Sequence, residues 1–260
     1  MPKNERAGLW RSVLGISVIL AIIFFVGLAA SAQDKKDNGY FARVNTFGVF
    51  STYSNDSSHI LLGEAESRKL FFLGASYSRR LILNHVVNWQ YNGEVMPLAL
   101  ESDPTVHIVL NWNQTPPPLP PINETLVPYN ACQTSSGTGT ATINGTSYTY
   151  TYSDTCGRQW TAGEAMSPMG LQLNFLPRNK AQVFLIGHGG YMYSTRPVPV
   201  LYSGSFNFTF DGGVGVELYR SETRSIRAEY RYHHFSNKDT ATENPGVDNG
   251  IVQVTYSFGR

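Results

Sequence analysis

The sequence predicts an all-β fold, an eight-stranded antiparallel transmembrane β-barrel with long extracellular loops. Three features predict it: segments in which apolar and polar residues alternate, connections that alternate between short and long, and a composition suited to strands. The chain of 260 residues contains 15 Tyr, 14 Phe and 24 Gly, and no long segment has the period of a helix. Its formal net charge of +1 gives no electrostatic case for binding nucleic acid.

The N-terminus indicates export. A basic start is followed by an apolar stretch at 13–29 and by Ala-Ser-Ala at 30–32, the small residues that precede a signal-peptidase cleavage site. We therefore expect a signal peptide at 1–32 and one outer-membrane barrel domain at 33–260. The alternative is an uncleaved anchor, because about 20 apolar residues can span a bilayer as a helix.

Eight segments are expected as strands: 40–54, 68–82, 85–98, 167–177, 180–193, 205–219, 224–237 and 249–258. In the sixth, Phe206, Phe208 and Phe210 alternate with Asn207 and Thr209, so one face of the strand is apolar. A soluble sandwich could alternate in the same way with its apolar face inward. The first two segments are apolar on both faces and leave their orientation open.

The connections favour the membrane barrel. Short turns near 84, 178 and 221 alternate with long links at 55–67, 99–166, 194–204 and 238–248. Outer-membrane barrels sort short turns to one side of the membrane and long loops to the other. An eight-stranded barrel is filled by side chains. The expected filling is a charged network of Glu94, Glu217, Arg227, Glu229 and Arg231.

The longest link, 99–166, carries its own signals. A proline-rich stretch at 116–121 should be extended, and Asn144-Gly145 between Thr/Tyr-rich arms predicts a hairpin. Cys132 and Cys156 are the two cysteines of an exported chain, so we expect one disulfide in a long extracellular loop.

The two C-terminal segments place reactive side chains on the apolar face. At a strand's period of two, His234 and Ser236 share the face of Tyr230, and Asp248 is in register with Val252 on the last strand. If the two strands form a hairpin, a base, a hydroxyl and a carboxylate meet on the side that faces lipid. This arrangement predicts a catalytic triad for a lipid substrate, whereas His233 should point into the lumen.

These residues resemble a known signature. The pattern His234-x-Ser236-Asn237, followed by Asn244-x-Gly246-x-Asp248, is similar to that of the lipid A 3-O-deacylases, the PagL-type outer-membrane esterases. The resemblance implies an esterase that removes the 3-O-linked acyl chain of lipid A with catalytic His234, Ser236 and Asp248. The family's acid is typically Glu, so Asp248 is a departure that shortens the side chain by one methylene.

The remaining roles follow from the chemistry. A developing oxyanion needs donors, and Asn237 is the first candidate, with Asn244 and the Gly246 backbone as support. Glu243 is the alternative acid if its loop folds back. We expect no cofactor and no metal site.

The expected location is the outer membrane of a Gram-negative bacterium, among outer-membrane lipids, with the active site at the outer leaflet where lipopolysaccharide lies. The alternatives are a non-catalytic structural or small-molecule-binding barrel and, third, a palmitoyl-transferring barrel.

Overall fold

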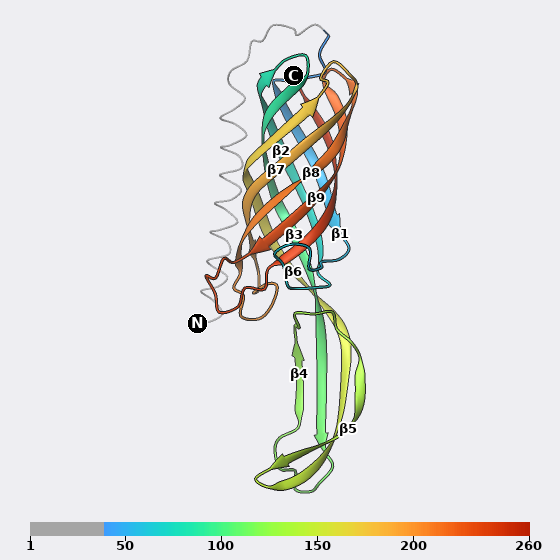
Figure 1. The fold of residues 1–260 in the computed structure, drawn as a ribbon, viewed down its shortest axis with the longest axis vertical. Helices are drawn as coiled ribbons and strands as arrows, with labels where there is room; N and C mark the ends of the chain where they lie inside the picture. The colour runs from blue at the N-terminus through green and yellow to red at the C-terminus, as the bar shows by residue number, and fades with distance from the viewer. Residues whose placement is uncertain (1–38) are drawn as a thin grey trace.

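The computed structural model describes residues 39–260, so the signal peptide expected at 1–32 lies outside the described residues. The described chain forms ten strands (Figure 1). They are β1 (Asn45–Ser54), β2 (Lys69–Leu83), β3 (Val87–Trp112), β4 (Ile122–Leu126), β5 (Ser135–Ile143), β6 (Thr146–Phe175), β7 (Ala181–Ser194), β8 (Phe206–Ser221), β9 (Arg224–Ser236) and β10 (Val247–Gly259). No helix within 39–260 has the length and apolar character needed to cross a membrane.

Eight of the strands, all except β4 and β5, close into a ring. The sheet runs β4-β3-β2-β1-β10-β9-β8-β7-β6-β5, and a further antiparallel pairing of β3 with β6 joins its two sides. Closure leaves no unpaired strand edge in the barrel wall. The predicted eight-stranded antiparallel barrel is therefore confirmed.

The connections are sorted by length, as the sequence predicts. Short links at 84–86, 176–180 and 222–223 lie at the end of the barrel that holds the C-terminus (Figure 1). The longer loops, at 55–68, 195–205 and 237–246, lie at the opposite end. We call this opposite end the loop end.

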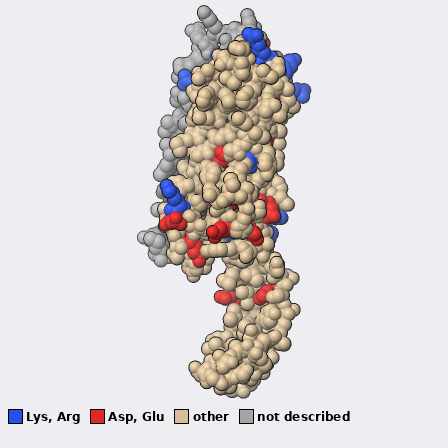
Figure 2. Space-filling model, viewed as in Figure 1, with Lys and Arg blue, Asp and Glu red and all other residues tan. Residues whose placement is uncertain are grey.

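The wall of the barrel is apolar outside and polar inside. Along β9 and β10, outward Tyr230 and Val254 are 57% and 51% exposed, whereas inward Arg231 and Gln253 are buried. Figure 2 shows few charged side chains on the wall and several near its two ends. This inversion of a soluble fold suits a wall that contacts lipid.

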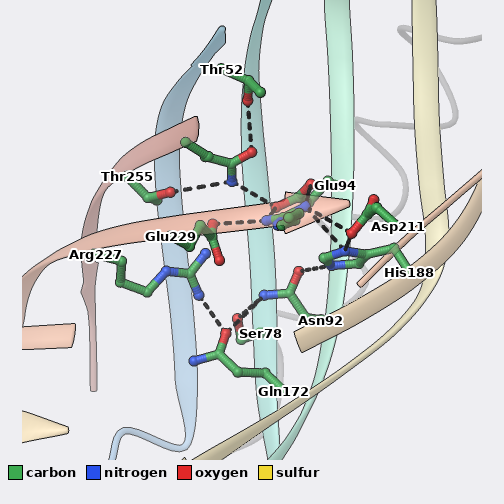
Figure 3. Close-up of polar contacts among 12 residues, drawn as sticks. Thr52, Ser78, Asn92, Glu94, Gln172, His188, Asp211, Arg227, Glu229 and Thr255 are labelled. Carbon is green, nitrogen blue, oxygen red and sulfur yellow. Dashed lines mark hydrogen bonds and ion pairs between the residues drawn. The ribbon is translucent and has the colours of Figure 1, made fainter. Parts of the chain in front are cut away.

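The lumen is filled by a polar network, as expected (Figure 3). Arg231 donates to Glu94 at 3.0 and 2.8 Å and to Glu229 at 2.8 Å. It also lies 3.3 Å from Asp211, which contacts His188 Nδ1 at 2.9 Å. Pairing satisfies charges that burial would otherwise make costly, so loss of one partner should destabilise the barrel by about 3–5 kcal/mol. The expected members Glu94, Glu217, Arg227, Glu229 and Arg231 are all buried.

An apolar core fills the lumen toward the loop end. Its buried members include Phe72 and Met96 from the wall, Ala65 and Val198 from the loops, and Phe235 from β9. His233 is buried here too, with its ring 5.7 Å from that of Phe72. This core packs behind the last residues of β9, so those residues have firm support at the rim.

The segment at 99–166 is more regular than the long loop that the sequence suggests. β3 and β6 run past the barrel and stay paired as far as Trp112 and Tyr150, and β4 and β5 add one strand on each side. We call this four-stranded extension at the loop end the arm (Figure 1). Along this extension β3 and β6 remain paired from Ala99–Gly163 to Trp112–Tyr150.

Two expectations within the arm are confirmed. Asn144 and Gly145 have φ of 49° and 78°, as a two-residue hairpin turn requires, and they join β5 to β6. Cys132 and Cys156 form a disulfide with their Cα atoms 5.7 Å apart. The bond joins the link between β4 and β5 to the part of β6 that lies in the arm.

Candidate active site at the loop end

The hairpin of β9 and β10 brings the predicted base and acid together. His234 is directly opposite Asp248 in the antiparallel register, and on the other side it is opposite Phe210 of β8. Ser236 ends β9 two residues further on, opposite Phe208. All these side chains belong to the outward face of the wall, where the strands reach the loop end.

A short hydrogen bond joins His234 to Asp248. The Nδ1 atom lies 2.6 Å from Asp248 Oδ1, and both residues are buried, at 6% and 0% exposure. The carboxylate accepts, so Nδ1 carries a proton, and in the neutral tautomer the lone pair is on Nε2. The ring of Phe210, with its centroid 5.0 Å from that of His234, covers one side of the imidazole. The hydrogen bond and the neighbouring ring fix the orientation of the imidazole, with Nε2 directed away from Asp248.

A loop closes over the acid. Asp248 Oδ2 accepts the backbone N–H groups of Leu61 at 2.7 Å and Leu62 at 2.9 Å. The Tyr232 hydroxyl donates to Oδ1 at 2.7 Å. Gly63 comes so close that a Cβ there would lie 2.5 Å from the backbone nitrogen of Asp248. We call residues 55–68 the clasp, because their backbone surrounds this carboxylate.

The clasp decides the charge of the acid. Asp248 is the second residue of β10, four residues before the exposed apolar residue Val252 begins the lipid-facing row. Burial raises the pKa of its carboxyl, but hydrogen bonds from the backbone of Gly63, Leu61 and Leu62 and from His234 outweigh burial and hold the pKa below its usual range. The group is therefore an anion at neutral pH.

Ser236 is half-buried on the same face as His234. Its hydroxyl makes no hydrogen bond to any residue in 39–260, so the structure pairs base with acid and places the hydroxyl alongside, unbonded. Hydrogen bonds of this kind are often long in a free enzyme and shorten when substrate binds.

The two asparagines hold the loop at 237–246. Asn237 Nδ2 donates to the carbonyls of Ser203 and of Glu243, the latter at 2.6 Å, and its backbone N–H donates to Asn244 Oδ1 at 3.0 Å. Asn244 Nδ2 in turn reaches Asp239 at 3.1 Å. With these donors engaged, the asparagines fix the path of the loop, and their oxyanion role stays a prediction.

Gly246 stands beside the imidazole. Its φ of +60° favours glycine, and a Cβ there would lie 3.0 Å from Cε1 of His234. Its carbonyl accepts the N–H of Ala65 at 3.1 Å, whereas its own N–H has no partner among residues 39–260. Gly246 is therefore the predicted supporting residue that has a free donor.

The structure brings Asp248, and not Glu243, to His234. The Glu243 carboxylate faces the hydroxyl of Tyr129 at the base of the arm. Its backbone N–H donates to the Tyr202 carbonyl at 3.2 Å. Glu243 thus belongs to the contacts between loops, and the loop does not fold back to present it to the imidazole.

Sequence reasoning missed the clasp and its anchor, Arg68. This fully buried guanidinium donates to the carbonyls of Glu66 at 2.5 Å, Tyr129 at 2.6 Å, Pro128 at 2.6 Å and Pro199 at 3.2 Å. It joins the clasp, the arm and the 195–205 loop. Backbone donors such as Leu61 and Leu62 leave no mark in a sequence, but Arg68, the first residue of the expected strand 68–82, was a usable signal.

A strip of the outer wall next to the site has no side chains. Gly187 and Gly189 of β7 and Gly212 of β8 lie on the outward face, with Gly187 paired to Gly212 and Gly189 paired to Phe210. A Cβ at any of them would have its nearest neighbour at 3.4 Å or more. We call these three residues the glycine strip, and it begins beside the ring that covers His234.

No group of three or more His, Cys, Asp or Glu side chains in the described part of the chain is arranged to hold a metal ion.

Comparisons with known proteins place the chain in a family. The model of the lipid A 3-O-deacylase (PagL) family matches residues 125–257, just over half of the chain and all of β6 to β10 up to Ser257. No curated protein matches.

Three solved structures are similar over most of the chain. The outer membrane enzyme PagL aligns with 82% of this chain and 99% of its own at 10% identity and a TM-score of 0.45. Neisserial surface protein A (83% and 97%, 11% identity, TM-score 0.41) and OprG from Pseudomonas aeruginosa (86% and 100%, 10% identity, TM-score 0.37) are also similar. On the match to its family model, the chain belongs to the lipid A 3-O-deacylase (PagL) family of the outer membrane.

Proposed function

We propose that this protein is an outer-membrane esterase that hydrolyses the 3-O-linked acyl chain of lipid A with a Ser236-His234-Asp248 triad. The observation that carries the proposal is the 2.6 Å hydrogen bond between His234 Nδ1 and Asp248 Oδ1 on the outward side of the barrel. An imidazole oriented by a carboxylate, on the same strand face as a serine, suits acyl transfer. Its position on an apolar wall suits a lipid ester.

In the proposed reaction, the Ser236 oxygen attacks the ester carbonyl carbon while Nε2 of His234 takes the hydroxyl proton. The Asp248 carboxylate stabilises the imidazolium that forms. The tetrahedral intermediate then expels the oxygen at the 3-position, which takes the proton from His234 and leaves as an alcohol. A water molecule repeats both steps on the acyl-enzyme, releases the fatty acid and restores the serine.

The developing oxyanion needs a donor that no other group already uses. The Gly246 N–H is such a donor, because it has no partner in 39–260 and lies next to the imidazole. Asn237 and Asn244 act through the loop that carries Gly246, since their donors hold that loop. We therefore propose Gly246 as the oxyanion donor and the asparagines as positioning residues.

The acyl chain lies along the glycine strip in this proposal. Removing side chains from one line of an otherwise bulky apolar wall leaves room for an alkyl chain in van der Waals contact with backbone. Phe208 and Phe210 border the strip where it meets the site, and both are exposed. A chain there would place its ester near Ser236.

The site faces the outer leaflet in this proposal, because long loops of outer-membrane barrels lie outside the cell and the pair lies at the loop end. Labelling intact cells with a membrane-impermeant reagent tests the orientation. A cysteine placed at Ser136 on the arm should react, and one placed at Glu222 in a short turn should not. The reverse pattern would contradict it.

One assay tests the activity. The purified protein is incubated with lipopolysaccharide and a palmitoyl phospholipid, which would be the donor for transfer, and lipid A is then examined by mass spectrometry. Loss of one hydroxyacyl mass, absent in the Ser236→Ala variant, is the expected result. A gain of palmitate would indicate transfer, and no change with a folded barrel would favour the non-catalytic alternative.

A further inference from the structure

The arm has two chemically different faces. Register places Leu110 and Trp112 of β3 on the same face as Tyr150 and Tyr152 of β6, because directly paired residues point the same way. Tyr148 belongs to this face too, which we call the tyrosine face. The opposite face carries Asn, Ser and Thr side chains from the same strands: Asn111, Thr138, Thr140, Thr149, Thr151 and Ser153.

Nothing in the described chain covers the tyrosine face completely. None of the hydrophobic side chains between 106 and 160, a range described in full, is fully buried, and Ile122 and Leu126 at its edge are 40% and 42% exposed. A sheet with one uncovered apolar face is a candidate interaction surface. The arm is continuous with two barrel strands, so this surface is held firmly at the loop end.

Two of the tyrosine rings each cover a glycine of the neighbouring strand β5. A Cβ at Gly139 would lie 2.5 Å from Cζ of Tyr150, and one at Gly137 would lie 3.2 Å from Cε1 of Tyr152, so each ring rests on the backbone of β5. The other face of each ring points away from the sheet. Trp112 meets Tyr150 edge-on, at 5.6 Å and 73°. The rings of Tyr150 and Tyr152 are tilted 52° to each other, so the face presents two separate ring surfaces with Trp112 at their side.

The charge of the arm limits what can bind there. Residues 105–157 contain no Lys or Arg. Their two carboxylate side chains, Glu124 and Asp154, are on the tyrosine face, and His107 is on the other face. Figure 2 shows this part of the molecule almost entirely without charge. Phosphate groups would find no cation here, so a neutral occupant suits this face better than an anionic one. It also carries apolar and hydroxyl groups together, as the rings and their phenol groups do.

We propose that the tyrosine face binds the neutral sugars of a glycan, with the C–H faces of sugar rings stacked on Tyr150 and Tyr152. Sugar hydroxyls bond to the phenol groups at the same time. The proposal rests on the proposed function only for the source of the glycan: a glycan attached to lipid A begins at the membrane surface beside the loop end, where the arm stands. Binding there would hold the substrate at the site.

Isothermal titration of the full chain in detergent micelles tests this proposal. The probe is the neutral polysaccharide released from smooth lipopolysaccharide by mild acid, which contains no lipid A ester. A Tyr150→Ala, Tyr152→Ala double variant should bind at least tenfold more weakly, and Tyr150→Phe should keep most of the affinity. The matched control is Thr151→Ala with Ser153→Ala on the opposite face of the same strand, which should bind like the parent.

Three results would overturn the proposal. The first is equal binding by the parent and the double tyrosine variant. The second is preference for the phosphorylated core oligosaccharide over the neutral polysaccharide. The third is a dimer in sedimentation that the double variant abolishes, since a second copy would then cover the face. Hydrolysis of rough lipopolysaccharide, which has a short glycan, should stay at the parent rate in all arm variants, so failure of binding is distinguishable from failure of the proposed activity.

Discussion

Replacing Asp248 by asparagine tests the role of the acid without removing its bulk. In the structure, Oδ2 accepts the N–H groups of Leu61 at 2.7 Å and Leu62 at 2.9 Å, and Oδ1 lies 2.6 Å from Nδ1 of His234. An amide has only one oxygen, and the two backbone donors require it. The NH₂ group of the asparagine must then face Nδ1 of His234, which has to accept.

The consequence is the wrong tautomer. The proton moves to Nε2, so His234 presents a donor where the reaction needs a base. The same change in a serine-protease triad lowers kcat about 10⁴-fold, so we expect a loss of that order, or about 5 kcal/mol in the barrier. Stability should change little, because Leu61 and Leu62 keep an acceptor. Asp248→Ala would leave both N–H groups unpaired, at about 1–3 kcal/mol each.

Hydroxyacyl release from lipopolysaccharide, followed by mass spectrometry, gives the rate, and the shift of the unheated band on electrophoresis reports a folded barrel. Tyr232→Phe is the control, because it removes the hydroxyl bonded to Oδ1 at 2.7 Å without changing the tautomer. It should cost less than about tenfold, as for one hydrogen bond. An Asp248→Asn enzyme that is folded and within tenfold of the parent rate would refute the orienting role.

Other variants test the surroundings of the site. Arg68→Met should lower activity more than tenfold and destabilise the protein by about 3–5 kcal/mol, because it removes the anchor of the clasp. Arg68→Lys should restore part of both the activity and the stability. Thermal unfolding measures the stability, and an Arg68→Met variant with the activity and unfolding temperature of the parent would contradict this prediction. Gly212→Leu should slow hydrolysis of long acyl chains at least tenfold but leave a short-chain nitrophenyl ester unaffected, whereas Val216→Leu on the same strand should change neither. Replacing Cys132 and Cys156 by serine should leave barrel folding and hydrolysis intact and make the arm more sensitive to protease; loss of the folded barrel would show that the disulfide is not peripheral.

The barrel could be predicted because its signals are periodic. Alternation fixes which side chains of a strand point outward, and in a closed barrel that choice propagates from strand to strand. The link between β9 and β10 is long, so a tight turn does not set their register. The outward apolar residues of the two strands set it instead, and Tyr230 of β9 is paired with Val252 of β10. The facing of His234 and Asp248 follows from the same register.

The arm and the contacts of the loops could not be predicted in this way. Thr/Tyr-rich alternation at 146–156 reads equally well as one hairpin or as two strands that extend the barrel sheet, and only the pairing with β3 decides. The donors on Asp248 are backbone groups of the clasp, which any sequence could supply. Asn237 looked like an oxyanion donor because a sequence shows a donor but not the carbonyls that already occupy it.

The clasp allows a charged carboxylate to lie close to the lipid-facing surface. An esterase for a lipid needs its base at the lipid surface, and the base needs an anion beside it, but a carboxylate facing lipid would be neutralised by burial. Within the lumen, buried Glu94 is paired with Arg231. An arginine paired with Asp248 would compete with His234, because the positive guanidinium would weaken the attraction between the carboxylate and the imidazolium. Backbone N–H groups of the clasp stabilise the anion without adding a positive charge, so the full charge of Asp248 remains available to His234 when it takes the proton.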